Sequence, residues 1–130
     1  MDRISQSPFS VFRGQKQHPD EEIKKAQLYL EDNFNRKVSF EKLASDLAIG
    51  RRNFDRRFKK ATGNTPAEYF LRIKVEAAKR SFESSSKSVK EVMFNVGYTD
   101  FKAFRNAFRK ITGLSPLEYR NKFNKRPLIT

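Results

Sequence analysis

Apolar residues recur at helical intervals along most of the chain. The first such run begins after Asp20, a residue type that often occupies the N-cap of a helix. Its apolar members are three or four residues apart and therefore share one face of a helix; they are Ile23, Ala26, Leu30 and Phe34. The pattern predicts a first helix, with one buried face, that starts after Asp20.

Six further helices are predicted by the same spacing together with local start and stop signals. They cover residues 40–47, 51–62, 66–84, 88–96, 101–112 and 115–123. The stretch 66–84 contains no helix breaker and would be about 27 Å long at about 1.5 Å per residue. No segment is convincing as a strand. We therefore predict an all-α fold with about seven helices, one of them a long linking helix.

A segment that contains the end of one helix and the start of the next occurs twice, 50 residues apart. Residues 54–69 read FDRRFKKATGNTPAEY and residues 104–119 read FRNAFRKITGLSPLEY. In each copy Gly ends a basic helix, and Thr or Ser, Pro and Glu then start the next one. A short helix and a tight turn precede each basic helix, from Ser39 and from Ser88. The repeat indicates two helix-turn-helix units.

These signals also predict how the chain is organised. We expect a linker or surface tail, a first helix-turn-helix subdomain, a linking helix, a second helix-turn-helix subdomain and a C-terminal tail. Their predicted ranges are 1–18, 19–64, 65–84, 85–124 and 125–130, respectively.

The charge balance points to an anionic partner. Lys and Arg number 28 against 15 Asp and Glu, which gives a net charge of +13 and a pI near 10.2. Nucleic acid is the first partner to consider and an anionic membrane the second, while a merely soluble basic protein is the plain alternative. The 13 Phe residues favour a folded core over a disordered basic tail.

Composition also narrows the chemistry. The chain has no cysteine, which removes disulfides, Cys-type zinc sites and thiol nucleophiles. No apolar stretch approaches the roughly 20 residues of a membrane span, so we expect a cytoplasmic protein without membrane contact. His18 is the only histidine, and the chain supplies no partners for a metal or catalytic role. We expect no metal, no cofactor and no enzymatic activity.

The outward faces of the two basic helices are the candidate DNA-contacting surfaces. Phe54 and Phe58, like Phe104 and Phe108, fall on the buried side at 100° per residue. Arg can pair with guanine and Asn with adenine in the major groove, at about 1 to 3 kcal/mol of discrimination each. The predicted base-reading residues are Arg51, Arg52, Asp55, Arg56, Asp100, Phe101, Lys102, Arg105 and Asn106. The predicted phosphate contacts are Lys59, Lys60, Arg109 and Lys110, with Ser39 and Ser88 at helix starts whose backbone N–H groups face phosphates.

Some of these positions have a second interpretation. Asp55 either reads a cytosine or pairs with Arg51 or Lys59 along its helix. Phe101, at the edge of the buried stripe, either packs within the protein or contacts a thymine methyl group. Arg57 lies near the buried arc and is predicted to snorkel or to pair internally.

The same residues resemble a known family. The segments NVGYTDFKAFRNAFRKITGLSPLEYR at 95–120 and FDRRFKKATG at 54–63 are similar to the DNA-binding domain of the AraC/XylS family of bacterial transcription regulators. The resemblance covers about residues 23–123. It implies sequence-specific binding of double-stranded DNA, with two recognition helices in successive major grooves about 34 Å apart. It also implies transcriptional regulation with RNA polymerase as a partner, as an activator or as a repressor, with activator taken as the expectation.

Two positions depart from the family pattern. Arg56 stands where the first recognition helix usually has a DNA-contacting Arg, but the matching place in the second is Asn106. An adenine preference of Asn106 is therefore the hypothesis for the second unit. Ala48 stands where such turns commonly have Gly, which costs about 1 kcal/mol if the residue is left-handed.

The family also bears on the extent of the chain. Its regulators often carry an effector-binding or dimerising domain before this one, so we expect an excised C-terminal piece rather than a protein that stands alone. Residues 5–9 and 18–20 resemble the connector of members with an amidotransferase-like N-terminal domain. One alternative function is a sequence-nonspecific basic helical module that binds nucleic acid or an anionic surface. Another, a DNA-repair methyltransferase, would need a cysteine acceptor.

Overall fold

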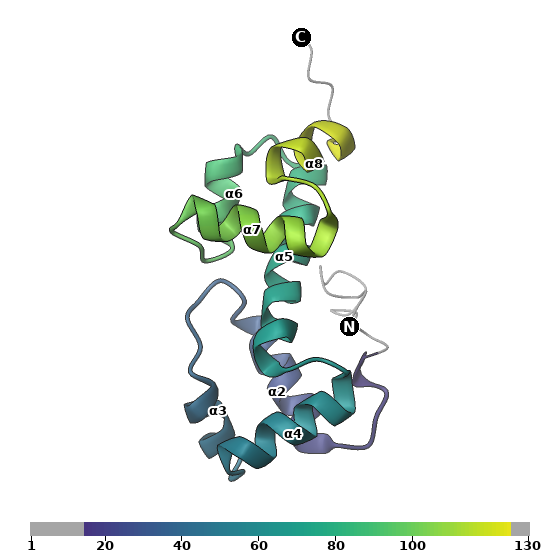
Figure 1. The fold of residues 1–130 in the computed structure, drawn as a ribbon, viewed down its shortest axis with the longest axis vertical. Helices are drawn as coiled ribbons and strands as arrows, with labels where there is room; N and C mark the ends of the chain where they lie inside the picture. The colour runs from purple at the N-terminus through teal and green to yellow at the C-terminus, as the bar shows by residue number, and fades with distance from the viewer. Residues whose placement is uncertain (1–14, 126–130) are drawn as a thin grey trace. The chain divides into compact units, whose positions relative to one another are not determined.

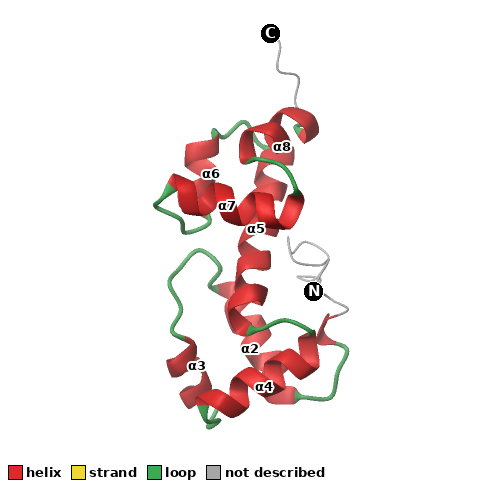
Figure 2. Cartoon of the chain, viewed as in Figure 1, coloured by secondary structure: helices red, strands yellow, loops and turns green. Residues whose placement is uncertain are grey.

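The computed structural model describes residues 15–125, and within that range it contains seven α-helices and no strand (Figures 1 and 2). The helices are α2 (Glu21–Asp32), α3 (Phe40–Asp46), α4 (Arg51–Thr62), α5 (Pro66–Ser84), α6 (Val89–Asn95), α7 (Phe101–Thr112) and α8 (Pro116–Phe123). The predicted all-α fold is confirmed. Most of the predicted tails, including the connector-like residues 5–9, lie outside the described residues.

The local signals in the sequence account for most helix ends. Gly63 and Gly113 follow α4 and α7 in the left-handed conformation, at φ 81° and 82°. This region is accessible to Gly without the clash that a Cβ causes. Three helix starts carry reciprocal capping boxes, formed by Thr65 with Glu68, Ser88 with Glu91 and Ser115 with Glu118. The first helix ends at Asp32, two residues before the apolar Phe34 that was expected to lie on it.

The chain divides into two compact units, each with its own core. Unit 1 is Met1–Ile73 and unit 2 is Lys74–Thr130. Helix α5 begins in unit 1 and ends in unit 2, so it supplies one segment to each unit.

Aromatic rings of α4 and α5 form the centre of unit 1. Phe54, Phe58 and Tyr69 have no exposed surface. The ring of Phe58 lies 5.8 Å from that of Phe54 and 5.3 Å from that of Tyr69, the latter edge to face. Such edge-to-face pairs add about 0.5 to 1.5 kcal/mol to the stabilisation from burial. The repeated Phe spacing in the sequence therefore anchors α4 in this core.

Unit 2 has the same arrangement in its own core. Phe82, Phe104 and Phe108 are fully buried, and Tyr119 is nearly so. The ring of Phe108 lies 5.9 Å from Phe104, 5.7 Å from Phe82 and 5.4 Å from Tyr119. The equivalent Phe residues of the two copies are thus used in the same way.

The structural repeat also includes a buried Tyr and a carboxylate in each unit. The Tyr69 hydroxyl donates to Glu31 on α2 at 3.0 Å, and the Tyr119 hydroxyl donates to Glu83 on α5. Burial and the neighbouring carboxylate raise the pKa of both tyrosines above the usual value. The second half of α5 therefore supplies to unit 2 the carboxylate that α2 supplies to unit 1. This equivalence was not evident in the sequence.

The segment just before α2 is attached to the core of unit 1. The side-chain amide of Gln27, fully buried on α2, donates to the Gln15 carbonyl at 3.0 Å and to the Tyr69 hydroxyl at 3.1 Å. His18 Nε2 bonds to the Gln27 oxygen at 2.9 Å, while His18 Nδ1 accepts the backbone N–H of Asp20 at 3.2 Å. A buried amide needs such partners. Gln15 and His18, predicted to belong to a linker or surface tail, are therefore attached to α2.

Candidate nucleic-acid interface

The two turns that precede the recognition helices share a left-handed residue. In unit 1 it is Ala48, at φ 60°, and in unit 2 it is Gly97, at φ 92°. The following residue in each turn, Ile49 or Tyr98, donates its N–H back to the short helix, at 2.9 and 3.0 Å. The departure seen at Ala48 is therefore a left-handed alanine, with a cost of about 1 kcal/mol.

Helix α4 separates its apolar and basic faces as its sequence predicted. Phe54 and Phe58 are buried in the core of unit 1. The predicted contact residues Arg51 and Asp55 are half-buried. The others on this helix are exposed, namely Arg52, Arg56, Lys59 and Lys60.

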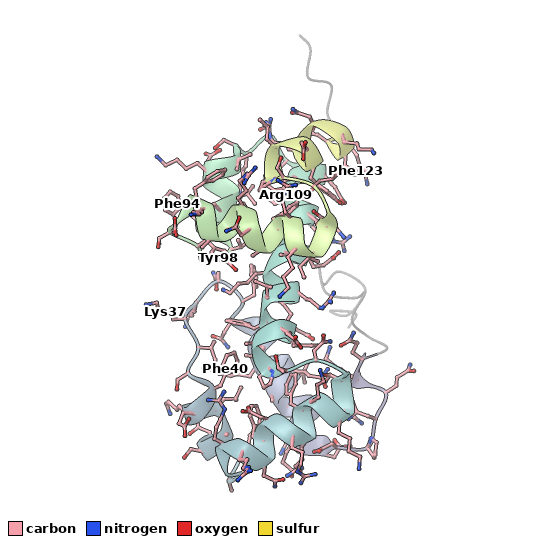
Figure 3. All side chains as sticks on the ribbon, viewed as in Figure 1. Lys37, Phe40, Phe94, Tyr98, Arg109 and Phe123 are labelled. Carbon is pink, nitrogen blue, oxygen red and sulfur yellow. The ribbon has the colours of Figure 1, made fainter. Side chains whose placement is uncertain are left out.

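Arg51 is held by three neighbours within unit 1. Its Nε donates to Asp55 at 2.9 Å and its Nη1 to Glu41 on α3 at 3.3 Å. Its guanidinium carbon lies 5.7 Å from the centre of the Phe40 ring (Figure 3), within the range of a cation–π contact. The hydrogen bond with Asp55 raises the pKa of Arg51. Of the alternatives for Asp55, the structure shows the pairing with Arg51 along the same helix. The contacts of Arg51 with Glu41 and Phe40 brace α4 against α3.

Arg57 and Arg56 follow each other on α4 but have different partners. Arg57 donates to Asp20 at 2.6 and 2.9 Å and to Glu22 at 3.0 Å, which confirms its predicted internal pairing. Hydrogen bonding from Arg57 to the Asp20 carboxylate is the main cause of the lowered pKa of Asp20. Arg56 is exposed and bonds only to Asn53, on its own helix, among the described side chains.

Helix α7 exposes the predicted contact residues of unit 2. Lys102, Asn106, Arg109 (Figure 3) and Lys110 are exposed, and Arg105 is half-buried. In the described chain none of these cations lies in an ion pair.

The first two residues of the α7 region have different environments. The Asp100 carboxylate accepts the Lys102 N–H at 3.2 Å and so caps the helix. Phe101 is 50% exposed. Phe101 is therefore not a core residue, unlike its neighbour Phe104, although about half of its surface is covered within the protein.

The two serines predicted near phosphates cap the first helix of each motif. The Ser39 hydroxyl accepts the Lys42 N–H and the Ser88 hydroxyl accepts the Glu91 N–H, both at 3.1 Å. Both serines are exposed. They stand at the surface, one in each unit, and each side chain is already used as a cap.

Lys74 is a residue of the second motif that sequence reasoning missed. Its ammonium donates to the Val96 carbonyl at 3.2 Å and lies 5.9 Å from the centre of the Tyr98 ring (Figure 3). Burial lowers the pKa of Lys74 to about 8. Lys74, on α5, therefore anchors the C-terminal end of α6. No local pattern signals this role, because Lys74 lies in the middle of a helix far along the chain from Val96.

Among residues 15–125, no helix has the length and hydrophobicity of a membrane span. The same residues contain no group of three His, Cys, Asp or Glu side chains suited to holding a metal ion.

The fold and the two basic helices define a class of protein, a tandem helix-turn-helix domain. The family described as "Helix-turn-helix domain" matches residues 43–122, and the chain belongs to it. The chain is 36% identical over 94 residues to the MmsAB operon regulatory protein of Pseudomonas aeruginosa, covering 72% of this chain and 31% of that protein. It is also 36% identical over 92 residues to the transcriptional activator RhaS of Escherichia fergusonii, covering 71% and 33%.

Two solved structures share this fold. The DNA-binding domain of AdpA, in complex with a target DNA, is 31% identical with a TM-score of 0.74, covering 82% of this chain and 97% of that one. The C-terminal domain of AraT from Geobacillus stearothermophilus has a TM-score of 0.78 at 23% identity, covering 85% and 93%. The chain is an AraC-family helix-turn-helix DNA-binding domain. It spans about a third of the length of the two curated relatives described here.

Proposed function

We propose that the chain is the DNA-binding part of a bacterial transcription regulator that recognises specific duplex sequences through α4 and α7. The observation that carries this proposal is the occurrence of two helix-turn-helix units that each expose a basic second helix. The size of such a helix suits the major groove. The named relatives support the proposal, because two are regulators of transcription and AdpA is described with a target DNA.

The environments of the side chains suggest a division of roles. The exposed Arg52 and Arg56 on α4, and Lys102, Arg105 and Asn106 on α7, are the proposed base readers. The cations further along each helix are the proposed phosphate contacts, with Ser39 and Ser88 at the starts of α3 and α6. They are Lys59, Lys60, Arg109 and Lys110.

Three predicted readers are already engaged in the protein. Arg51 and Asp55 bond to each other, and Asp100 caps α7. These bonds use only part of the hydrogen-bonding capacity of each side chain, but they fix its orientation within the protein. Their proposed contribution is therefore mainly to hold α4 and α7 in shape for the readers beside them.

The whole protein is proposed to contain more than this domain. Its relatives are about three times as long as the matched region, which leaves room for an effector-binding or dimerising domain. The connector-like residues 5–9 and 18–20 suggest the amidotransferase-like subgroup. Because RhaS is named an activator, we propose activation in the cytoplasm with RNA polymerase as a partner.

Two variants on consecutive turns of α4 test the assignment of roles. Binding sites would first be selected from random duplexes with the parent chain. Arg56→Ala should then relax the preference at one base pair, by about 1 to 3 kcal/mol. Lys59→Ala should weaken binding evenly across sites and reduce the salt slope by about 1. Identical sequence profiles for the two variants would contradict the division of roles.

The dependence of affinity on salt separates this proposal from its alternatives. Neutralised phosphates release counterions, so log affinity should fall linearly with log salt on the selected duplex. A slope near zero would contradict DNA binding through the basic helices. Equal affinity for all duplexes would favour the sequence-nonspecific basic module instead.

A further inference from the structure

The first residue of the second recognition helix is an exposed aromatic. Phe101 begins α7, and half of its side-chain surface is open to solvent. In the first unit the equivalent residue is Arg51, which is bound to Glu41 and Asp55 and stacked against a ring. The two recognition helices therefore start with different chemistry.

The surroundings of Phe101 cannot form the brace that holds Arg51. The residues equivalent to Phe40, Glu41 and Asp55 are Val89, Lys90 and Arg105. The described rings also include no aromatic partner for Phe101. Its exposed apolar surface is thus not explained by the packing of unit 2. Leaving half of a Phe side chain in water forgoes part of the stabilisation that its burial would give.

The charges next to Phe101 indicate what covers it. Lys102, Arg105 and Asn106 follow it on the same helix and are at least partly exposed. A cationic helix complements the phosphates of a duplex, whereas an apolar protein partner would have to bury these charges. In the major groove the distinctive apolar group is the 5-methyl of thymine, which Phe is able to contact.

We propose that Phe101 contacts the 5-methyl group of a thymine in the half-site read by α7 and so determines specificity at that position. The proposal rests on the proposed function, because it requires α7 to enter the groove by its N-terminal end. Unit 1 has a charged brace at the same place, so this apolar contact belongs to the second half-site alone.

Replacing thymine with uracil tests the contact, because it removes only the methyl group. Each thymine of the selected duplex would be replaced singly, and the dissociation constant of the parent chain measured. One replacement, in the α7 half-site, should weaken binding about 3- to 10-fold, as expected for the loss of one buried methyl. A parent chain that tolerates every replacement equally would overturn the proposal.

Variants then assign the effect to Phe101. The Phe101→Ala variant should bind the thymine and uracil duplexes with equal affinity. The Phe101→Leu variant keeps an apolar side chain and should again bind the thymine duplex more tightly than the uracil duplex. Phe94 on α6 (Figure 3) is the matched control, since it is a 49% exposed Phe of the same unit. Phe94→Ala should keep the full difference. Circular dichroism checks that each variant remains helical.

The outcomes separate this inference from the proposed function. If the parent chain binds the selected duplex no better than a scrambled one, both are wrong. If it prefers the selected duplex but Phe101→Ala keeps the sensitivity to uracil, only the thymine contact is wrong.

Discussion

The two units share an internal scaffold but differ on the surface of their recognition helices. In the core the correspondence is close, with Phe58 matched by Phe108 and the Tyr69–Glu31 pair by Tyr119–Glu83. On the surface unit 1 uses charge pairs, such as that of Arg57 with Asp20. At the position of Arg57 unit 2 has an alanine, Ala107.

This difference indicates two ways of presenting a recognition helix. In unit 1 carboxylates from α2, α3 and α4 itself hold two of the arginines, which leaves Arg52 and Arg56 to face outward. In unit 2 no described ion pair involves α7, so its cations all remain available to a ligand. The core arrangement that the two units have in common positions the two recognition helices. Because the surfaces of these helices differ, we expect each to bind a different half-site.

The largest expected effect tests whether the two cores are separate. Phe58→Ala and Phe108→Ala each remove a fully buried ring and should lower the free energy of unfolding by about 3 to 5 kcal/mol. Hydrogen exchange followed by mass spectrometry should then show lost protection mainly in the mutated unit. Equal loss of protection across both units, for either variant, would show that the cores are one cooperative structure.

The next effect tests the polar network around Gln27 in unit 1. Gln27→Ala removes the side-chain amide that donates to the Tyr69 hydroxyl and to the Gln15 carbonyl, and should lower the free energy of unfolding by about 2 kcal/mol. The matched control is Lys79, four residues before Glu83 as Gln27 is four residues before Glu31. Lys79 has a partly exposed bond to its own helix, so Lys79→Ala should cost less than about 0.5 kcal/mol. Urea denaturation measures the free energy of unfolding of both variants. Similar losses in the two would show that the network around Gln27 stabilises unit 1 no more than the Lys79 ion pair stabilises unit 2.

The Arg57 pair should give unit 1 a pH-dependent stabilisation for which unit 2, with Ala107 at the equivalent position, has no counterpart. Arg57→Ala should cost about 1 kcal/mol at pH 7, because both partners are mostly shielded from solvent. Since the pKa of folded Asp20 is below its usual 3.8, the stabilisation is complete above that usual value and is lost as the pH falls through the folded value.

The gap in stability between Arg57→Ala and the parent should therefore narrow on acidification from pH 7 to below pH 3.8, measured by thermal unfolding. The exposed Lys60 supplies the control, as Lys60→Ala should show no such narrowing. A gap that stays constant into strong acid would mean that Asp20 does not stabilise the fold through Arg57.

The smallest effects concern the turns. Gly97→Ala should cost about 1 kcal/mol, because φ 92° is unfavourable for a residue with a Cβ. Ala48→Gly removes such strain but makes the unfolded chain more flexible, so the net gain should be about 0.5 kcal/mol. Melting temperatures measured on both variants would show shifts of opposite sign. A destabilised Ala48→Gly would indicate that the left-handed alanine is not strained.

The sequence by itself determined the helices, most of their ends, and the inward and outward faces of α4 and α7. These features follow from local chemistry, since caps such as Ser88 with Glu91 join residues three apart. The spacing of Phe54 and Phe58 likewise assigns a buried side without knowledge of the rest of the fold. The candidate site was therefore predictable as a set of outward positions on two basic helices.

Only the tertiary structure decided which of those positions are engaged within the protein. Arg51 is occupied because α3 brings Glu41 to it, and Phe101 is exposed because nothing described in unit 2 covers it. The docking of His18 on Gln27 and the bond from Lys74 to Val96 also join residues on different segments. Such contacts depend on how helices pack, and local spacing carries no information about that packing.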